Sequence, residues 1–325
     1  MKVFYASVVS LLLLLAALTL RVDLGLDAPI LAASGRSAPE WQVAEGWVNS
    51  KPLRLADLRG KVVLVDFWTY SCINCLRTIP YLNKWYDQYK DRGLVIVGIH
   101  TPEFGFEGQQ VNVDDAVKRF GITFPVAQDN EYATWKGYDN FAWPGFYLID
   151  QQGRIVFTKY GEGEYDRTEN RIRKLLGIED TVARDDGPDL SRVQTPEMYF
   201  GTAHESHQSA NQNPAAGSKM YELPGTLRSI EFALSGTWSR TAERATLDSD
   251  HGAITLRFNA AKVHLVAGAA TPIEVIVHVD GGTPHSVLVA RPQLYTLYDG
   301  SDYREHTLQI EIPARGFDAY SFTFG

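Results

Sequence analysis

The stretch KVVLVDFWTYSCINC, at residues 61–75, decides the fold of the first half of this chain. Residues 61–68 form an almost continuous apolar run, which is typical of a β-strand buried on both faces. A short turn and then Cys72 and Cys75 follow, and the pattern after them is helical to about Lys90, with a kink expected at Pro80. This order predicts an α/β domain with two cysteines at the start of a helix.

These two cysteines are the only ones in the 325 residues. A disulfide that serves as a structural staple usually closes a long loop, whereas this pair would constrain the unfolded chain very little. On a helix, an offset of three residues brings the two Cβ atoms to about 5–6 Å, within reach of a disulfide. We therefore predict that the pair is chemically active.

The helix assigns different roles to the two thiols. Cys72 would lie at the helix N-terminus, where free N–H groups stabilise a thiolate, and Cys75 would be shielded one turn further on. We expect Cys72 to attack a substrate disulfide and Cys75 to resolve the mixed disulfide. Asp66, inside the apolar strand, should have a raised pKa and could accept the Cys75 proton; an ordinary hydrogen-bonded aspartate is the alternative.

Other interpretations of the cysteines are inert buried thiols and a structural zinc site. Zinc would need two further ligands, and the only candidates, His204 and His207, fall in the other half of the chain. We expect neither a metal nor a cofactor. The net charge of −8 also argues against a nucleic-acid-binding protein, which needs a basic surface.

An uncharged apolar run from Val3 to Leu20 follows Lys2. At 1.5 Å per residue it approaches the roughly 30 Å of a bilayer core. The nearest small-residue cleavage site, at 32–34, lies well beyond the run, which favours a signal anchor over a cleaved signal peptide. We predict a membrane-anchored protein on the extracytoplasmic, periplasmic side, which would be secreted if the segment were cleaved.

The periodicity of apolar and polar residues divides the rest of the chain into an α/β domain followed by an all-β domain. Strand-length segments near the C-terminus alternate apolar and polar residues, as in an antiparallel β-sandwich or jelly roll with a carbohydrate-binding-module-like strand pattern. The predicted units are a signal anchor at 1–21, a tether at 22–39, the α/β domain at 40–177, a linker at 178–198 and the sandwich at 199–325.

Periodicity also gives the individual elements of the α/β domain. We expect a capping box between Asp166 and Glu169 at the start of its last helix. The expected elements are strands at 61–68 and 93–100, helices at about 73–90, 114–120 and 166–176, and a hairpin of 146–150 with 154–159.

Several motifs resemble the thioredoxin superfamily, in particular its extracytoplasmic TlpA/ResA-like branch. They are Leu58–Lys61 before the strand, the cysteine pair, Pro80, and Trp143–Pro144 before a later strand. Together with the β-sandwich, the motifs WTYSCINC (68–75), HTPE (100–103), LID (148–150) and FTFG (322–325) are similar to the C-terminal periplasmic part of the DipZ proteins. Those proteins also carry a polytopic electron-transferring membrane domain, so here we expect the electron donor to be a separate, CcdA-like membrane protein.

The resemblance also implies roles for individual residues. Asp66 takes the place of thioredoxin's buried acid, and Pro144 that of the cis-proline beside the disulfide, where exposed backbone pairs with an extended substrate. Trp68, Ser71 and Trp143 have supporting positions around the cysteines, and Ser71 makes the rim smaller and more polar than a tryptophan would. Glu103 either reaches the site from an adjoining loop or is a surface carboxylate, and the second interpretation is favoured.

We therefore predict a thiol–disulfide oxidoreductase that reduces disulfides of extracytoplasmic proteins, serves redox homeostasis and includes cytochrome maturation factors among its clients. A reductant is favoured because Ile73 and Asn74 place no cation between the cysteines, which leaves the helix terminus and Arg77. The alternatives are a disulfide oxidase and a thiol peroxidase, although the proline of the peroxidase loop is missing before Cys72. A different class is a glycan- or partner-binding protein acting through the sandwich, whose aromatic residues Trp238, Phe258 and Tyr295 more readily fill its core.

Overall fold

The computed structural model describes residues 35–325 apart from 44–45, 186, 188–189, 205–206 and 213. The predicted anchor and most of the predicted tether lie outside these residues. Within the described part of the chain, no helix is both long and apolar enough to cross a bilayer. The end of the predicted tether lies along the α/β domain, where Ser37 bridges Arg154 and the Ala38 N–H donates to the Gly153 carbonyl (2.9 Å).

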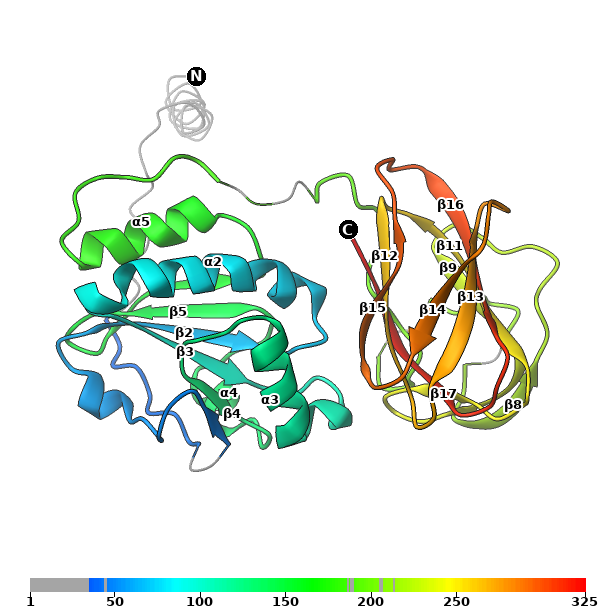
Figure 1. The fold of residues 1–325 in the computed structure, drawn as a ribbon, viewed down its shortest axis with the longest axis horizontal. Helices are drawn as coiled ribbons and strands as arrows, with labels where there is room; N and C mark the ends of the chain where they lie inside the picture. The colour runs from blue at the N-terminus through cyan, green and yellow to red at the C-terminus, as the bar shows by residue number, and fades with distance from the viewer. Residues whose placement is uncertain (1–34, 44–45, 186, 188–189, 205–206, 213) are drawn as a thin grey trace, which may run out of the picture.

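The first domain is a thioredoxin-like α/β fold around a mixed sheet (Figure 1). Its strand order is β1-β4-β3-β2-β5-β6, with β2 and β3 parallel at the centre. The strands are β1 (Trp47–Val48), β2 (Val62–Trp68), β3 (Leu94–His100), β4 (Val126–Gln128), β5 (Gly145–Ile149) and β6 (Ile155–Tyr160). The helices are α2 (Ile73–Tyr89), α3 (Gln110–Arg119), α4 (Ala133–Gly137) and α5 (Tyr165–Leu175), with short 3-10 turns η1 (Leu55–Leu58), η2 (Lys90–Arg92) and η3 (Gly105–Gly108).

The alternation of side chains along β2 explains the layers. Leu64 and Trp68 pack with residues of α2, α3 and α5 on one face of the sheet, and Val65 and Phe67 pack with the N-terminal segment and α4 on the other. All seven residues of β2 are buried, as its apolar run predicts. The strand before the cysteines therefore lies in the middle of the core and fixes where α2 begins.

Two local predictions differ from the structure. Helix α3 begins at Gln110, four residues before the predicted start. The capping box of α5 is wrong, since its N-cap is Glu164 in a left-handed conformation without a side-chain cap. Glu169 instead turns inward and accepts hydrogen bonds from Trp85 Nε1 (2.9 Å) and the Tyr89 hydroxyl (2.5 Å) of α2, so tertiary contacts override the local motif.

The second domain is an antiparallel, sandwich-like β domain, as predicted. The strands in order along its sheet are β14-β13-β16-β11-β9-β10-β17-β12-β15, with β7 on β17 and β8 on β9. They are β7 (Met198–Tyr199), β8 (Gly217–Tyr221), β9 (Glu231–Arg240), β10 (Ala245–Leu247), β11 (Gly252–Asn259), β12 (Lys262–Ala269), β13 (Ile273–Val279), β14 (His285–Val289), β15 (Gln293–Asp299), β16 (Glu305–Ile312) and β17 (Phe317–Phe324). Trp238, Phe258 and Tyr295 lie in its core, which confirms the packing interpretation of these aromatic residues.

The last residues of the predicted linker pack against this second domain. The Thr195 hydroxyl donates to the Asn259 carbonyl (3.1 Å) and accepts from the Asn259 N–H (2.7 Å). Met198 and Tyr199 form β7, which pairs with Phe322 and Ser321 of β17. This pairing carries residues just after the linker to the side of the second domain that meets the first.

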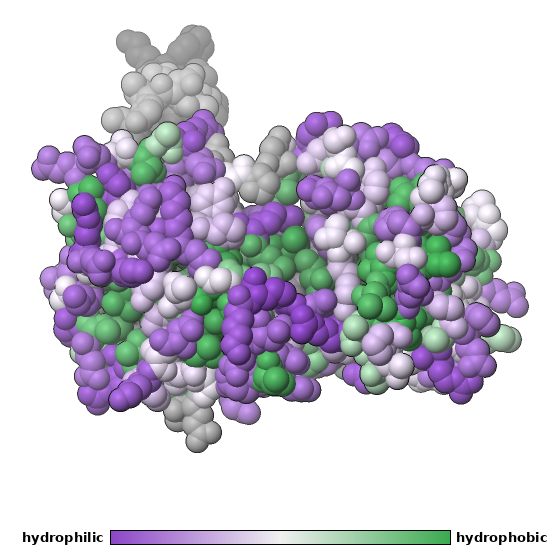
Figure 2. Space-filling view, viewed as in Figure 1, coloured by the Kyte–Doolittle hydropathy of each residue, from purple (hydrophilic) through white to green (hydrophobic). Residues whose placement is uncertain are grey.

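The two domains lie side by side (Figure 1). They share an apolar contact, because Val266 and Tyr320 of the second domain belong to a hydrophobic cluster of the first. The Tyr320 ring of β17 packs against Phe104 and Phe106 of the first domain, with ring centroids 5.1 and 4.8 Å apart. Figure 2 shows apolar residues gathered where the domains meet. Polar contacts surround them, including Gly105 N–H to Glu243 Oε2 (3.1 Å) and the ion pair of Arg291 with Asp115 (3.0 Å).

Candidate active site

The two cysteines are free thiols placed as the sequence predicts. Cys72 is the N-cap of α2, with an extended backbone, and its side chain is partly exposed. Cys75 lies in the first turn of α2 and is only 1% exposed. Burial, and next the adjacent Cys72, raise the pKa of Cys75 well above its usual value. Cys72 is thus the accessible sulfur and Cys75 a thiol held in its protonated form.

Asp66 lies behind the cysteines, in the middle of β2. It is 1% exposed, and its Oδ1 has no hydrogen-bond partner among the described residues. Desolvation raises the pKa of Asp66 to about 8, and its charge acts on Cys75. At neutral pH the group is therefore mostly a neutral acid, which becomes a base near Cys75 as the pH rises. Its part in proton transfer stays a prediction.

Trp68 and His100 are buried packing residues beneath the site. Their rings meet edge to face with centroids 5.1 Å apart, and His100 stacks on Tyr70 at 5.6 Å. Desolvation lowers the pKa of His100 to about 3, so the imidazole is neutral at physiological pH. These contacts give both side chains a structural role at the ends of β2 and β3.

The residue before Cys72 is held by a carboxyl group that the sequence did not reveal. Ser71 Oγ donates to Oε1 of Glu107 in η3 (2.5 Å), and both side chains are buried. The other Glu107 oxygen accepts the backbone N–H groups of Glu103 (2.6 Å) and Phe104 (2.9 Å). Glu107 therefore joins the turn before α2 to the loop that follows β3.

Trp143 and Pro144 come directly before β5. The peptide bond between them is cis, as the resemblance implies. Trp143 Nε1 donates to the Thr101 carbonyl (3.1 Å), and its ring packs against Trp135 with centroids 4.4 Å apart. These contacts hold the Trp143 ring in place. The ring lies beside Cys72, since both side chains line the same cavity.

That cavity has a volume of about 360 Å³ and is formed by both domains. The first domain contributes Cys72, Ile73, Asn74, Glu103, Tyr132, Phe141 and Trp143, and the second contributes Glu197, Tyr199, His204 and Thr323. The second domain therefore forms part of the cavity wall beside Cys72. Nothing in the local sequence reveals these four residues, since their position depends on the pairing of β7 with β17.

Glu103 is not the free surface carboxylate that the sequence favours. It is half-buried in the cavity, and its Oε1 lies 2.8 Å from the hydroxyl of Tyr199. Burial, and then the charges of Glu197 and Glu107, raise the pKa of Glu103 well above its usual value. The structure thus brings Cys72, Trp143 and Glu103 together, and leaves Asp66, Trp68 and Ser71 behind the surface of the cavity.

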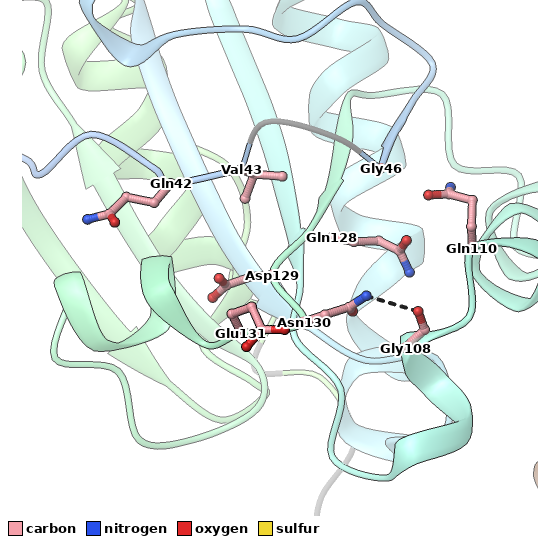
Figure 3. A pocket seen from close by; sticks show the side chains of 9 residues that line it. All are labelled: Gln42, Val43, Gly46, Gly108, Gln110, Gln128, Asp129, Asn130 and Glu131. Carbon is pink, nitrogen blue, oxygen red and sulfur yellow. Dashed lines mark hydrogen bonds between the residues drawn. The ribbon is translucent and has the colours of Figure 1, made fainter.

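A second cavity lies elsewhere on the first domain, beside β4 (Figure 3). Its wall is mostly amide and carboxylate side chains, and Asn130 Nδ2 donates to the Gly108 carbonyl (2.9 Å). The Asp129 carboxylate accepts the N–H groups of Thr134 and Trp135, which stabilises the start of α4. Across the described residues, no three His, Cys, Asp or Glu side chains are grouped as metal ligands would be.

This fold and this cysteine pair define a thioredoxin-like protein with an additional antiparallel β domain. Residues 33–176 match the Redoxin family, and residues 195–325 match the family described as thioredoxin-like C-terminal domain. The chain is 30% identical to the thiol-disulfide oxidoreductase ResA of Bacillus thuringiensis, over 43% of this chain and 78% of ResA. It belongs to this family of thioredoxin-like thiol–disulfide oxidoreductases.

Similarity to the DipZ proteins extends over both domains. The protein DipZ of Mycobacterium bovis and that of Mycobacterium tuberculosis are each 38% identical to this chain over 300 residues, or 89% of its length. The chain spans 43% of the length of these two relatives. The similarity confirms the resemblance drawn from the motifs. Because it covers less than half of a DipZ protein, the activity of the whole DipZ protein is not assigned to this chain.

Proposed function

We propose that the protein is an extracytoplasmic reductant of protein disulfides. The observation that carries this proposal is the difference between its two thiols: Cys72 is partly exposed at the N-terminus of α2, and Cys75 is buried and protonated behind it. A thiol–disulfide exchange needs one accessible thiolate to attack and a second, shielded thiol to resolve.

The reaction would proceed in two exchanges. The Cys72 thiolate attacks one sulfur of the substrate disulfide, forming a mixed disulfide and releasing the other sulfur as a thiolate, which takes up a proton. Cys75 then loses its proton and attacks Cys72, which releases the second substrate thiol and leaves a Cys72–Cys75 disulfide. The substrate gains two electrons and two protons, and a CcdA-like membrane dithiol would return the protein to its reduced form.

The extracytoplasmic location rests on the apolar run at residues 3–20 and on the similarity to DipZ. Clients would be disulfide-containing proteins of that compartment, with cytochrome maturation factors among them on the resemblance alone. The cavity at Cys72 is open to solvent between the domains, and the exposed Phe141 at its edge offers an apolar contact for a client chain.

Reduction of insulin by the reduced protein tests the proposal. The wild type should precipitate the insulin B chain at a rate proportional to its concentration, and Cys72→Ser should abolish this activity. A parallel measurement of peroxide consumption separates the thiol-peroxidase alternative. Rapid peroxide turnover with no insulin reduction would overturn the proposed function.

A further inference from the structure

The cavity contains a phenol held between two carboxyl groups. The hydroxyl of Tyr199, in β7, lies 2.8 Å from Oε1 of Glu103 and 3.0 Å from Oε2 of Glu197. Glu103 belongs to the first domain and the other two residues to the second, and all three side chains line the cavity that Cys72 also lines. The two domains therefore meet at this contact, on the wall of the active site.

A count of hydrogens favours an additional proton on these groups. A phenol has one hydrogen and can donate it to one carboxylate only. The second contact at hydrogen-bond distance then needs a protonated carboxyl group that donates to the phenol oxygen. With both glutamates ionised, one carboxylate oxygen would face a phenol lone pair at about 3 Å, which is repulsive.

The surroundings favour the protonated form. Burial raises the pKa of Glu103 and of Glu197, and the charges that act on Glu103 are those of Glu197 and Glu107, which raise it further. Burial and the two carboxyl groups also raise the pKa of Tyr199, so the phenol keeps its hydrogen. Among the described residues, the polar or titratable groups around these three include Tyr132, His204, Glu243, Ser321 and Thr323, and His204 stacks on the Tyr199 ring at 4.3 Å.

We propose that Glu103, Tyr199 and Glu197 form a proton-holding unit that delivers a proton to the sulfur expelled when Cys72 attacks a substrate disulfide. This inference rests on the proposed function. Glu103 is the member on the Cys72 side of the domain contact and would meet the departing sulfur, while Tyr199 and Glu197 act through it. The second domain thus completes the active site.

The step balances without an added reactant. The Cys72 thiolate forms a bond to one substrate sulfur, the substrate S–S bond breaks, and the other sulfur leaves with the electron pair. The Glu197 proton passes to the phenol oxygen, the Tyr199 hydrogen passes to the Glu103 carboxylate, and Glu103 delivers one proton to that sulfur. The unit ends with one more negative charge and regains its proton from solvent.

The increase in rate that the proton-holding unit can give depends on the pKa of the leaving thiol. An alkyl thiol has a pKa of about 8.5, so it is a poor leaving group near neutral pH unless an acid protonates it. An aromatic thiol with a much lower pKa leaves readily as an anion and gains little from an acid. General acid catalysis typically contributes about 10²–10⁴-fold in rate.

The experiment compares two disulfides in single turnovers of the reduced full-length protein. One is a cystine-bridged peptide, and the other is a bis(nitrobenzoate) disulfide that releases a coloured aromatic thiolate. Tyr199→Phe removes the hydroxyl and keeps the ring that stacks on His204. We expect it to slow attack on the peptide by about tenfold or more, and attack on the aromatic disulfide by less than about twofold.

Tyr298→Phe is the matched control, because it removes a hydroxyl that contacts a carboxylate (Asp302 Oδ1, 3.4 Å) outside this cavity. It should change neither rate. Glu197→Gln serves as a second variant should Tyr199→Phe fold poorly, with the same selective loss expected.

The possible results separate the two proposals. If Tyr199→Phe slows attack on both disulfides equally, or on neither, the proton-holding unit is overturned and the reductase function stays intact. A wild type that reduces neither disulfide would instead overturn the proposed function.

Discussion

Ser71, the residue before the attacking cysteine, donates a 2.5 Å hydrogen bond to the buried carboxyl group of Glu107. The same carboxyl group accepts the backbone N–H groups of Glu103 and Phe104. One side chain therefore fixes both the turn that presents Cys72 and the loop that carries Glu103. This link makes Glu107 a positioning residue for the two sides of the cavity within the first domain.

Glu107→Ala should destabilise the protein by about 3 kcal/mol or more, because it leaves buried donors without an acceptor. Glu107→Gln should cost less, since its amide oxygen can still accept. Urea unfolding of the full chain measures both changes, and Glu179→Ala, at an exposed position, is a control expected to stay within about 0.5 kcal/mol. A Glu107→Ala variant as stable as the control would show that the three donors find other partners.

The local pattern of residues was sufficient to predict the centre of the fold. The apolar run of β2 and the spacing of Cys72 and Cys75 predict what the structure shows, because strand burial and helix position follow from neighbouring residues. The tandem of an α/β and an all-β domain could be predicted for the same reason, from the change in periodicity. The cis bond before Pro144 is instead implied by the resemblance to the thioredoxin superfamily.

Contacts distant in sequence could not be predicted. Tyr199 reaches the cavity because β7 pairs with β17 more than a hundred residues later, and two residues of strand carry no pattern of their own. Glu169 looked like part of a helix cap, yet it is drawn to Trp85 and Tyr89 of another helix. In both cases tertiary pairing decides what a polar side chain does.

The different exposure of the two cysteines predicts different variants. Cys72→Ser should abolish insulin reduction, and Cys75→Ser should leave a protein that forms long-lived mixed disulfides through Cys72. Alkylation of the reduced wild type at neutral pH, followed by peptide mass mapping, should label Cys72 well before Cys75, because Cys75 is buried and its pKa is raised. Earlier labelling of Cys75 would reverse the assigned roles.

Asp66 should make stability depend on pH. Its pKa is about 8 in the folded protein and about 3.9 when unfolded, so between these values the folded state binds a proton that the unfolded state does not. The contribution of Asp66 to stability is therefore complete below about pH 4, decreases by up to about 1.4 kcal/mol per pH unit as the pH rises from about 4 to about 8, and is lost above that. Asp66→Asn should lack this loss and become more stable than the wild type toward pH 8.

Urea unfolding at pH 5 and pH 8 tests this dependence. The difference in unfolding free energy between Asp66→Asn and the wild type should be larger at pH 8.

The rate at which the mixed disulfide is resolved should change in the opposite sense. If ionised Asp66 accepts the Cys75 proton, resolution of the mixed disulfide in the wild type should accelerate as the pH rises toward 8, and the variant should lose that acceleration. Identical pH–rate profiles for the two proteins would remove Asp66 from the mechanism.

The direction of electron flow depends on how strongly the Cys72 thiolate is stabilised. Arg77 is the cation that the sequence places nearest to the pair, but its guanidinium group is held by Glu162 with two 2.8 Å hydrogen bonds and donates a third to Asn74 Oδ1 (2.9 Å). With that charge neutralised, the thiolate relies on the start of α2. We expect a reduction potential more negative than about −180 mV, on the reducing side of the disulfide isomerases.

Titration against glutathione measures this potential, and Glu162→Gln tests its cause. Freeing Arg77 should stabilise the thiolate and raise the potential by about 10–30 mV, since 30 mV corresponds to about 1.4 kcal/mol for a two-electron couple. Glu164→Gln is the matched control, because Glu164 pairs with Arg167 at the exposed start of α5, and it should leave the potential unchanged. A wild-type potential above about −180 mV would make the protein an oxidant, and equal shifts in the two variants would show that Arg77 has no specific influence on Cys72.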